Sequence, residues 1–198
     1  MKYISILFIT ILLLSCDNEK ETVTVITDKD ATELFDIAET ATSELVNRLG
    51  GRLVEVIQNE GVIEAIDVCY KEAYEITDEL TDEIDEIKSI KRVTTKFRNP
   101  KNAPDIYEVD ALRWFEEQHA NGTKPTSFGQ KISKRKGDLI RYYKPMYVQN
   151  KCLLCHGDET DIMPDIAKKI DNLYPDDLAK NYNQGDFRGL VRVELKGD

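Results

Sequence analysis

The chain has 198 residues, of which 41% are hydrophobic and 32% are charged. This is enough for one domain with an apolar core, and the composition excludes a wholly disordered chain. The 37 acidic and 27 basic residues give a formal net charge of −10, the opposite of what a nucleic-acid-binding surface needs. We therefore expect one acidic globular domain without a nucleic-acid partner.

The N-terminus carries an apolar run over residues 3–15, preceded by Lys2. A membrane span takes about 20 apolar residues, so a run of this length with a basic residue before it indicates an export signal. The run ends in Leu13-Leu14-Ser15-Cys16, which resembles the lipobox of bacterial lipoproteins. We expect removal of residues 1–15, a lipid anchor on Cys16, and a membrane-anchored protein on the periplasmic side. Ordinary secretion with cleavage nearby is the alternative.

Residues 17–29 are polar and show no helical period. They are expected to form a tether, so that the chain divides into a lipoprotein signal peptide (1–15), a tether (16–29) and one folded domain (30–198).

The first predicted element of the domain is a long helix. Asp30 and Glu33 form a start similar to a capping box, and apolar residues recur at helical spacing from Leu34 onward. The pair Gly50-Gly51 would be expected to end the helix, but the apolar residues after it stay in phase. We therefore predict one continuous helix to about Asn59.

A second helix is predicted from Gly61 to about Ile87, with apolar residues three and four positions apart that include Cys69. Its opposite face is strongly acidic between residues 78 and 86. Such a run is most simply a solvated helix face, so we assign no partner to it.

The later part of the chain has β-type patterns over residues 92–95, 139–148 and 189–195. A helix is predicted between the first two, over 105–120, and the basic cluster 131–136 is expected in a hairpin loop. Long helices followed by a small sheet give an α+β fold class.

The chemistry is concentrated in Cys152-Leu153-Leu154-Cys155-His156. A C-x-x-C-H string is the attachment signature of a c-type haem, because two thiols add to the two vinyl groups and the adjoining His reaches the iron. Three alternatives remain open: a Cys152–Cys155 disulfide, a Cys₃His zinc site that also uses Cys69, and a thioredoxin-type redox pair. A thioredoxin-type pair would require a βαβ arrangement, which the predicted helices and strands do not form.

Cys69 is the cysteine left over when Cys16 carries lipid and two others form thioethers. On its helix stripe it could be a plain core residue, because a free Cys packs as a small hydrophobe. It is also a candidate for the second axial position of the iron. Other residues of suitable chemistry are His119, Met146 and Met163.

Four strings in this order resemble a bacterial family once catalogued as a domain of unknown function. They are Gly61–Cys69, Arg98–Pro104, Tyr143-Lys144-Pro145 leading to Cys152–Gly157, and Tyr174–Asp177 with Gly185–Gly189. Members of that family are c-type haem proteins with a PAS-like fold. The resemblance implies long N-terminal helices packed on a small antiparallel PAS-like sheet and one covalent haem c. It also implies His156 on one side of the iron and, by position, Cys69 on the other.

A thiolate ligand stabilises Fe(III) and lowers the reduction potential relative to a Met ligand. We therefore expect a haem-based redox or gas sensor, with a diatomic gas or a redox partner protein as its partner. A membrane-tethered electron-transfer cytochrome is the alternative, and a four-helix cytochrome c′ is a further one. The absence of P-loop, G-x-S-x-G and H-E-x-x-H motifs leads us to expect no enzymatic activity.

Arg98 lies in a rigid loop rich in proline and asparagine. Haem carboxylates need a cation, so we expect Arg98 to pair with a haem propionate. The alternative is a solvated or structural arginine.

Overall fold

The computed structural model describes residues 21–26, 32–135 and 137–196. The expected signal peptide and Cys16 lie outside these residues. The described chain is mixed α+β with an antiparallel sheet, which confirms the expected fold class. The strands, in the sheet order β1-β3-β4-β5-β2, are Thr22–Ile26 (β1), Phe128–Ser133 (β3), Leu139–Tyr147 (β4), Phe187–Leu195 (β5) and Ile87–Val93 (β2).

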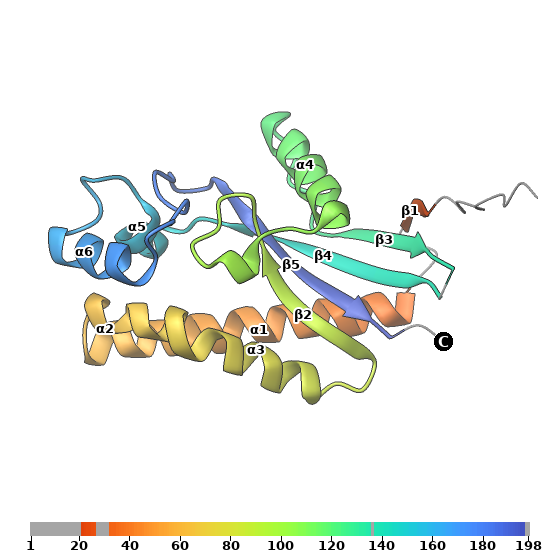
Figure 1. Cartoon of the computed structure of the whole chain (residues 1–198), viewed down its shortest axis with the longest axis horizontal. Coiled ribbons are helices and arrows are strands. Elements are labelled where there is room, and N and C mark those ends of the chain that lie inside the picture. Colours follow the sequence, from red (N-terminus) through yellow and green to blue (C-terminus); the bar gives the residue numbers. More distant parts are fainter. Residues whose placement is uncertain (1–20, 27–31, 136, 197–198) are drawn as a thin grey trace, which may run out of the picture.

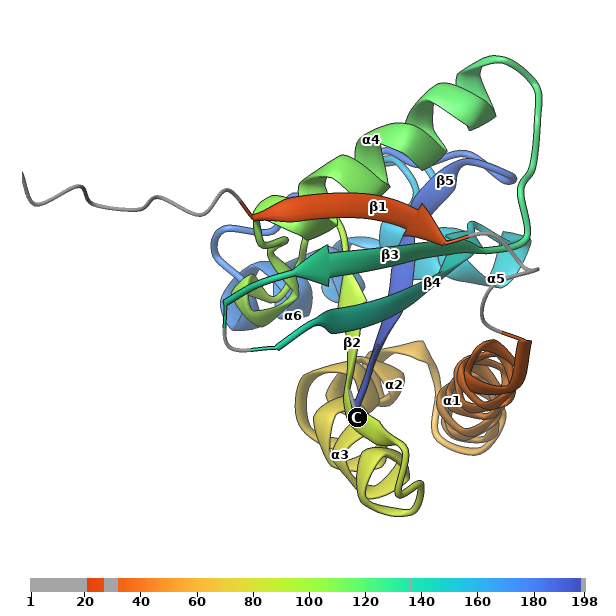
Figure 2. The ribbon, with the colours of Figure 1, turned by 90° about the vertical axis from the view of Figure 1, so that its right-hand side faces the viewer.

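Helices cover both faces of this sheet (Figures 1 and 2). The helices α1, α2 and α3 lie against one face, α4 lies on the other, and α5 and α6 lie at one end. The helical elements are Thr32–Asn59 (α1), Val62–Asp67 (α2), the π-helix Val68–Glu72 (η1), Ala73–Asp82 (α3), the 3-10 turn Pro100–Asn102 (η2), Ile106–Ala120 (α4), Asn150–His156 (α5) and Pro164–Leu173 (α6).

Helix α1 runs unbroken through Gly50-Gly51 and ends at Asn59, as the sequence predicts. Its apolar stripe, which includes the fully buried Leu45, packs on the sheet with Val193 and Leu195 of β5. This packing stabilises the helix more than the two glycines weaken it. No helix of the described segments combines the length and apolar character needed to cross a membrane.

The second predicted helix is shorter and less regular than expected. It is divided into α2, η1 and α3, and it ends at Asp82 rather than near Ile87. Ile87 instead opens β2, where it is buried against the sheet core and pairs with Leu195. One apolar residue at the end of a helical pattern does not fix where the helix ends, and pairing with β5 decides that Ile87 belongs to the sheet.

Two strands were not predicted. Strand β1 lies within the segment assigned to the tether, and its residues pair with β3 from Thr22↔Ser133 to Ile26↔Gly129. Val23 and Val25 remain 43% and 62% exposed. The strand therefore lacks the row of buried apolar residues by which a strand is recognised in a sequence. Strand β3 includes Lys131 of the basic cluster, and the hairpin turn comes only after Ser133.

Candidate functional site

The C-x-x-C-H string forms helix α5. At spacings of three and four, Cys152, Cys155 and His156 lie on one side of the helix, which suits binding to one edge and one face of a flat group. Gly157 ends the helix, and a Cβ at this position would lie 2.3 Å from the Asp161 carboxylate. Glycine therefore allows the following loop to fold back closely against the helix end.

The loop over residues 177–183 is fastened to the end of α5 by backbone hydrogen bonds. The N–H of Tyr182 donates to the His156 carbonyl at 3.0 Å, and the N–H of Asn181 donates to the Gly157 carbonyl at 2.8 Å. The ring of His156 is held as well, because its Nδ1 lies 2.8 Å from the Ala179 carbonyl. A carbonyl only accepts, so Nδ1 carries the proton and Nε2 presents a lone pair suitable for a metal.

The electrostatic surroundings keep His156 neutral. Burial, reinforced by the cations Arg98 and Arg188, holds the pKa of the imidazole well below its ordinary value. The hydrogen bond to Ala179 acts in the opposite direction but is outweighed. A neutral imidazole is the form that binds iron or zinc.

Arg98 lies in a buried ion pair within the chain, as the alternative of a structural arginine describes. Its guanidinium forms an ion pair with Asp177 at 3.0 Å, and the two side chains are 9% and 1% exposed. It also donates to the carbonyl of Cys155 at 2.5 Å and to that of Ala179 at 3.4 Å. The carboxylate partner of Arg98 is therefore Asp177 of the chain itself, and Arg98 ties the end of α5 to the loop that orients His156.

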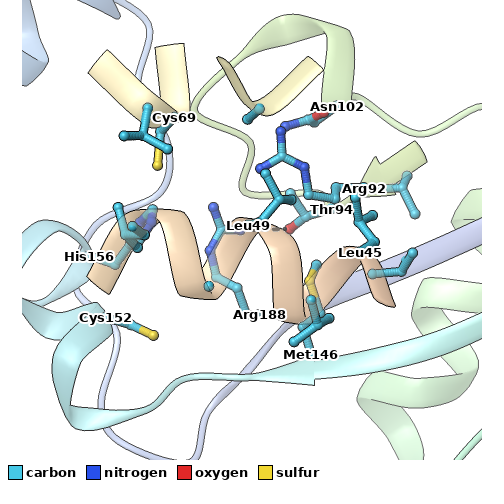
Figure 3. A pocket seen from close by; sticks show the side chains of 17 residues that line it. Leu45, Leu49, Cys69, Arg92, Thr94, Asn102, Met146, Cys152, His156 and Arg188 are labelled. Atoms are coloured by element: carbon cyan, nitrogen blue, oxygen red, sulfur yellow. Dashed lines mark hydrogen bonds between the residues drawn. The ribbon is translucent and has the colours of Figure 1, made fainter. Parts of the chain in front are cut away.

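A cavity of about 250 Å³ lies beside α5, between α1, η1 and strands β2, β4 and β5. Helix α1 contributes an apolar wall of leucines, including Leu45 and Leu49. Figure 3 shows Cys69 and Cys152 on either side of His156 at one end of this cavity. The fold thus brings together three of the predicted site residues, which come from positions up to 87 apart in the chain.

Cys69 projects from η1, the π-helical segment, where the N–H of Ala73 donates to the carbonyl of Val68. A π-helical turn is rare and frequently marks a functional site. Burial raises the pKa of the Cys69 thiol, and the positive charges of Arg92, Arg98 and Arg188 oppose this effect. Burial also raises the pKa of Cys155, to about 11.

Of the other candidate iron ligands, one lines the cavity beside His156 and two lie elsewhere. Met146 lines the same cavity as Cys69. Met163 is 61% exposed and precedes α6, while His119 lines a separate open cavity beside Lys96 and Asp186. The structure thus leaves Cys69 and Met146 as the soft ligands that face the His156 cavity.

The structure also bears on the zinc and disulfide alternatives. Cys69, Cys152 and Cys155 are all unbridged. Within residues 21–26, 32–135 and 137–196, no three Cys, His, Asp or Glu side chains are grouped so that they could hold a metal ion. The tetrahedral Cys₃His arrangement is therefore not formed by the described residues.

Two site residues were missed by sequence reasoning. Arg92 of β2 and Arg188 of β5 both line the cavity. Arg92 lies in the predicted β-type segment 92–95, where a basic residue is equally typical of solvent-facing positions. Arg188 lies in the Gly185–Gly189 string, where the sequence assigned it no role. Strand pairing and the placement of α1 decide that they face the cavity instead.

The fold and site define an α+β protein with a C-x-x-C-H helix closing one end of a cavity. The model of the Tll0287-like family matches residues 19–195, and the chain belongs to this family. Among solved structures, the crystal structure of the cyanobacterial heme-protein Tll0287 is similar, with 23% identity and a TM-score of 0.60. The match covers 84% of this chain and 96% of that chain, and it supports the fold. No curated protein matches the chain.

Proposed function

We propose that this protein binds one haem covalently through Cys152 and Cys155, with His156 and Cys69 as the two axial ligands of the iron. The observation that carries the proposal is the convergence of Cys69, Cys152 and His156 on one largely apolar cavity. The similarity to a cyanobacterial protein described as a heme-protein supports it. Covalent attachment of a c-type haem uses two thiols, and imidazole and thiolate are both known iron ligands in haem proteins.

The residues of the site fit this group. Cys152 and Cys155 would supply the two thiols, each adding S–H across one haem vinyl group. His156 is fixed by the Ala179 carbonyl with Nε2 free, and the leucines of α1 exclude water from the buried side. Arg92 and Arg188 supply positive charge to the same cavity.

We further propose that the site is a redox or gas sensor rather than an enzyme. A bound haem supplies a reversible Fe(III)/Fe(II) couple and a position for a diatomic ligand. A Cys69 thiolate would favour the ferric form and would bind the reduced iron less strongly. Cys69 lies on the short η1 segment, whose movement would carry the redox state to α2 and α3.

An electron-transfer cytochrome is the second candidate function. One contact favours it: the ring of Tyr182 meets that of His156 edge-on, with centroids 6.5 Å apart. The Lys96 ammonium lies 4.1 Å above the same tyrosine ring. Tyr182 therefore offers a short aromatic connection from the iron ligand to a charged side chain of the surface.

The covalent attachment is tested by mass spectrometry and a pyridine haemochrome spectrum, after expression with a haem-attachment system. We expect the mass of one haem and a Soret band. Cys152→Ala and Cys155→Ala should each leave at most one thioether bond. A wild-type chain without added haem mass, and with one equivalent of zinc, would overturn the proposal in favour of the zinc site.

The axial ligand is tested by Cys69→Ala, with Met146→Leu as the matched control from the same cavity and His119→Ala from outside it. Cys69→Ala should keep covalent haem, lose the ferric low-spin thiolate spectrum and raise the reduction potential. Cys69→Ser should behave similarly, because a neutral hydroxyl is a poor substitute for a thiolate. An intact ferric spectrum in Cys69→Ala, or its loss in either control, would refute the assignment.

Carbon monoxide separates the two functions. If Cys69 leaves the reduced iron, the ferrous wild-type protein should bind carbon monoxide, and so should Cys69→Ala. A ferrous protein that keeps both ligands and binds no carbon monoxide supports the electron carrier.

We also propose that the protein is exported and anchored through Cys16. Expressed from its full-length sequence in a bacterial host, the protein should occur in the membrane fraction with lipid on Cys16. Cys16→Ala should release it from that fraction, whereas an unmodified N-terminus near residue 16 would support ordinary secretion.

A further inference from the structure

The cavity contains a guanidinium group that forms no ion pair with a carboxylate of the described chain. Arg188 is half-buried, and its Nη1 atom donates to the Lys96 carbonyl at 3.1 Å, to Thr94 Oγ1 at 3.3 Å and to the Tyr182 hydroxyl at 3.5 Å. All three acceptors are neutral. Burial and the charge of Arg98 lower the pKa of Arg188, while Tyr182 and the more distant Asp177 act in the opposite direction.

The hydrogen bonds of Arg188 all come from one side of the guanidinium. Every hydrogen bond uses Nη1, and no acceptor among the described residues meets Nε or Nη2. The guanidinium carbon also lies 5.2 Å from the centre of the Tyr182 ring. The Nε and Nη2 groups form one of the two-pronged edges through which arginine binds a carboxylate. Arg188 is therefore positioned by the hydrogen bonds of one nitrogen and by the Tyr182 ring, while a carboxylate-binding edge remains available.

Arg92 is similar. Its guanidinium lies 5.7 Å from the centre of the Tyr74 ring, and its side chain makes no ion pair or hydrogen bond within the described segments. Figure 3 shows the guanidinium groups of Arg92 and Arg188 among the side chains that line the cavity. Two cations thus face the space that the cofactor would fill.

The other buried arginines of the molecule are paired. Arg98 meets Asp177, Arg141 meets Glu194 at 2.9 Å, and Arg192 meets Glu108 at 3.1 Å. A charge removed from water is costly unless a counter-charge accompanies it. The cavity departs from this rule, so the missing negative charge is expected on a ligand.

We propose that Arg188 binds one carboxylate of the haem through Nε and Nη2, and that Arg92 supplies the second positive charge for the haem carboxylates. This inference rests on the proposed function, because it requires haem in the cavity. It assigns to Arg188 and Arg92 the role that the sequence suggested for Arg98.

The test is the pH dependence of the reduction potential of the holoprotein. An ionised carboxylate near the iron stabilises Fe(III), so the potential falls as the pH rises through the carboxylate pKa. A neighbouring cation lowers that pKa. In Arg188→Gln the midpoint of this fall should therefore move upward by about one pH unit or more. Arg188→Lys keeps the charge without the two-pronged edge and should give a smaller upward shift.

Arg113→Gln is the matched control, because Arg113 is 64% exposed and outside the cavity. Its midpoint should equal that of the wild type. Arg92→Gln should also move the midpoint upward, and it provides the test if Arg188→Gln yields no soluble holoprotein. Resonance Raman spectra of the carboxylate bending modes should change in the same variants.

The outcomes separate the two proposals. A wild-type chain without haem refutes the proposed function itself. Attached haem with an unchanged axial-ligand spectrum, but with unchanged midpoints and bending modes in Arg188→Gln and Arg92→Gln, overturns the carboxylate assignment alone. A shift in Arg98→Ala without one in Arg188→Gln would return the role to Arg98.

Discussion

The two faces of the sheet treat buried charge in opposite ways. On the α4 face, Glu108 is fully buried and is paired with Lys91 at 2.8 Å and Arg192 at 3.1 Å. On the face covered by α1 and α3, Arg92 and Arg188 line a cavity without a carboxylate partner in the described chain. The first face pairs its buried charges within the protein, whereas the proposed haem carboxylates would supply the negative charge on the second.

Strand β5 contributes to both faces through its two-residue alternation. Arg192 and Glu194 point toward α4, where Glu194 pairs with Arg141 of the neighbouring strand. Val191 and Val193 point toward α1 and form part of the apolar core. Every position from Gly189 to Leu195 is buried, so polar and apolar residues share one strand at equal depth. The difference between the faces lies in the partners and not in burial.

The largest loss of stability is expected when the buried carboxylate on the α4 face is removed. Glu108→Ala leaves Lys91 and Arg192 without their buried carboxylate and removes the acceptor for the Asp105 N–H. The free energy of unfolding should fall by about 3–5 kcal/mol. Urea denaturation followed by circular dichroism measures this loss. Asp110→Ala, an exposed position on the same helix, should change stability by less than about 0.5 kcal/mol.

A smaller effect is expected from the ion pair between α5 and its loop. Arg98→Ala leaves Asp177 buried without its cation and frees the Ala179 carbonyl region that orients His156. We expect a loss of about 2–3 kcal/mol in stability, together with a broadened or partly high-spin haem spectrum. Arg98→Lys should recover part of both. A stability loss with an unchanged spectrum and potential would show that Arg98 supports the fold without acting on His156.

The smallest loss of stability is expected from the protonation of Glu194 at low pH. Burial alone would raise the pKa of Glu194, but its bond to Lys88 and the charges of Arg141 and Arg192 outweigh burial and lower it. A carboxyl whose pKa is lower in the folded state stabilises the protein above its unfolded value of about 4.3, and this stability is lost as pH falls below that value. Chemical denaturation between pH 7 and pH 3 measures the loss. Glu194→Gln should flatten this part of the profile.

Local patterns determined several elements correctly from the sequence. The helix predicted over 105–120 is α4, whose cap at Asp105 is closed by Glu108, and the segments over 139–148 and 189–195 became β4 and β5. The C-x-x-C-H string needs only one helical turn to place its three side chains together. Such features depend on residues a few positions apart, so they can be predicted from the local sequence.

Tertiary contacts decided the rest. Whether Ile87 continues a helix or opens a strand depends on pairing with β5, and β1 exists only because β3 offers its edge. The role of Arg98 depended in the same way on Asp177, which is 79 residues away. The sequence alone does not show which carboxylate, if any, each arginine pairs with. Their partners distinguish them, and a buried charge finds its partner across the fold because the cost of leaving it unpaired is paid only after the chain has folded.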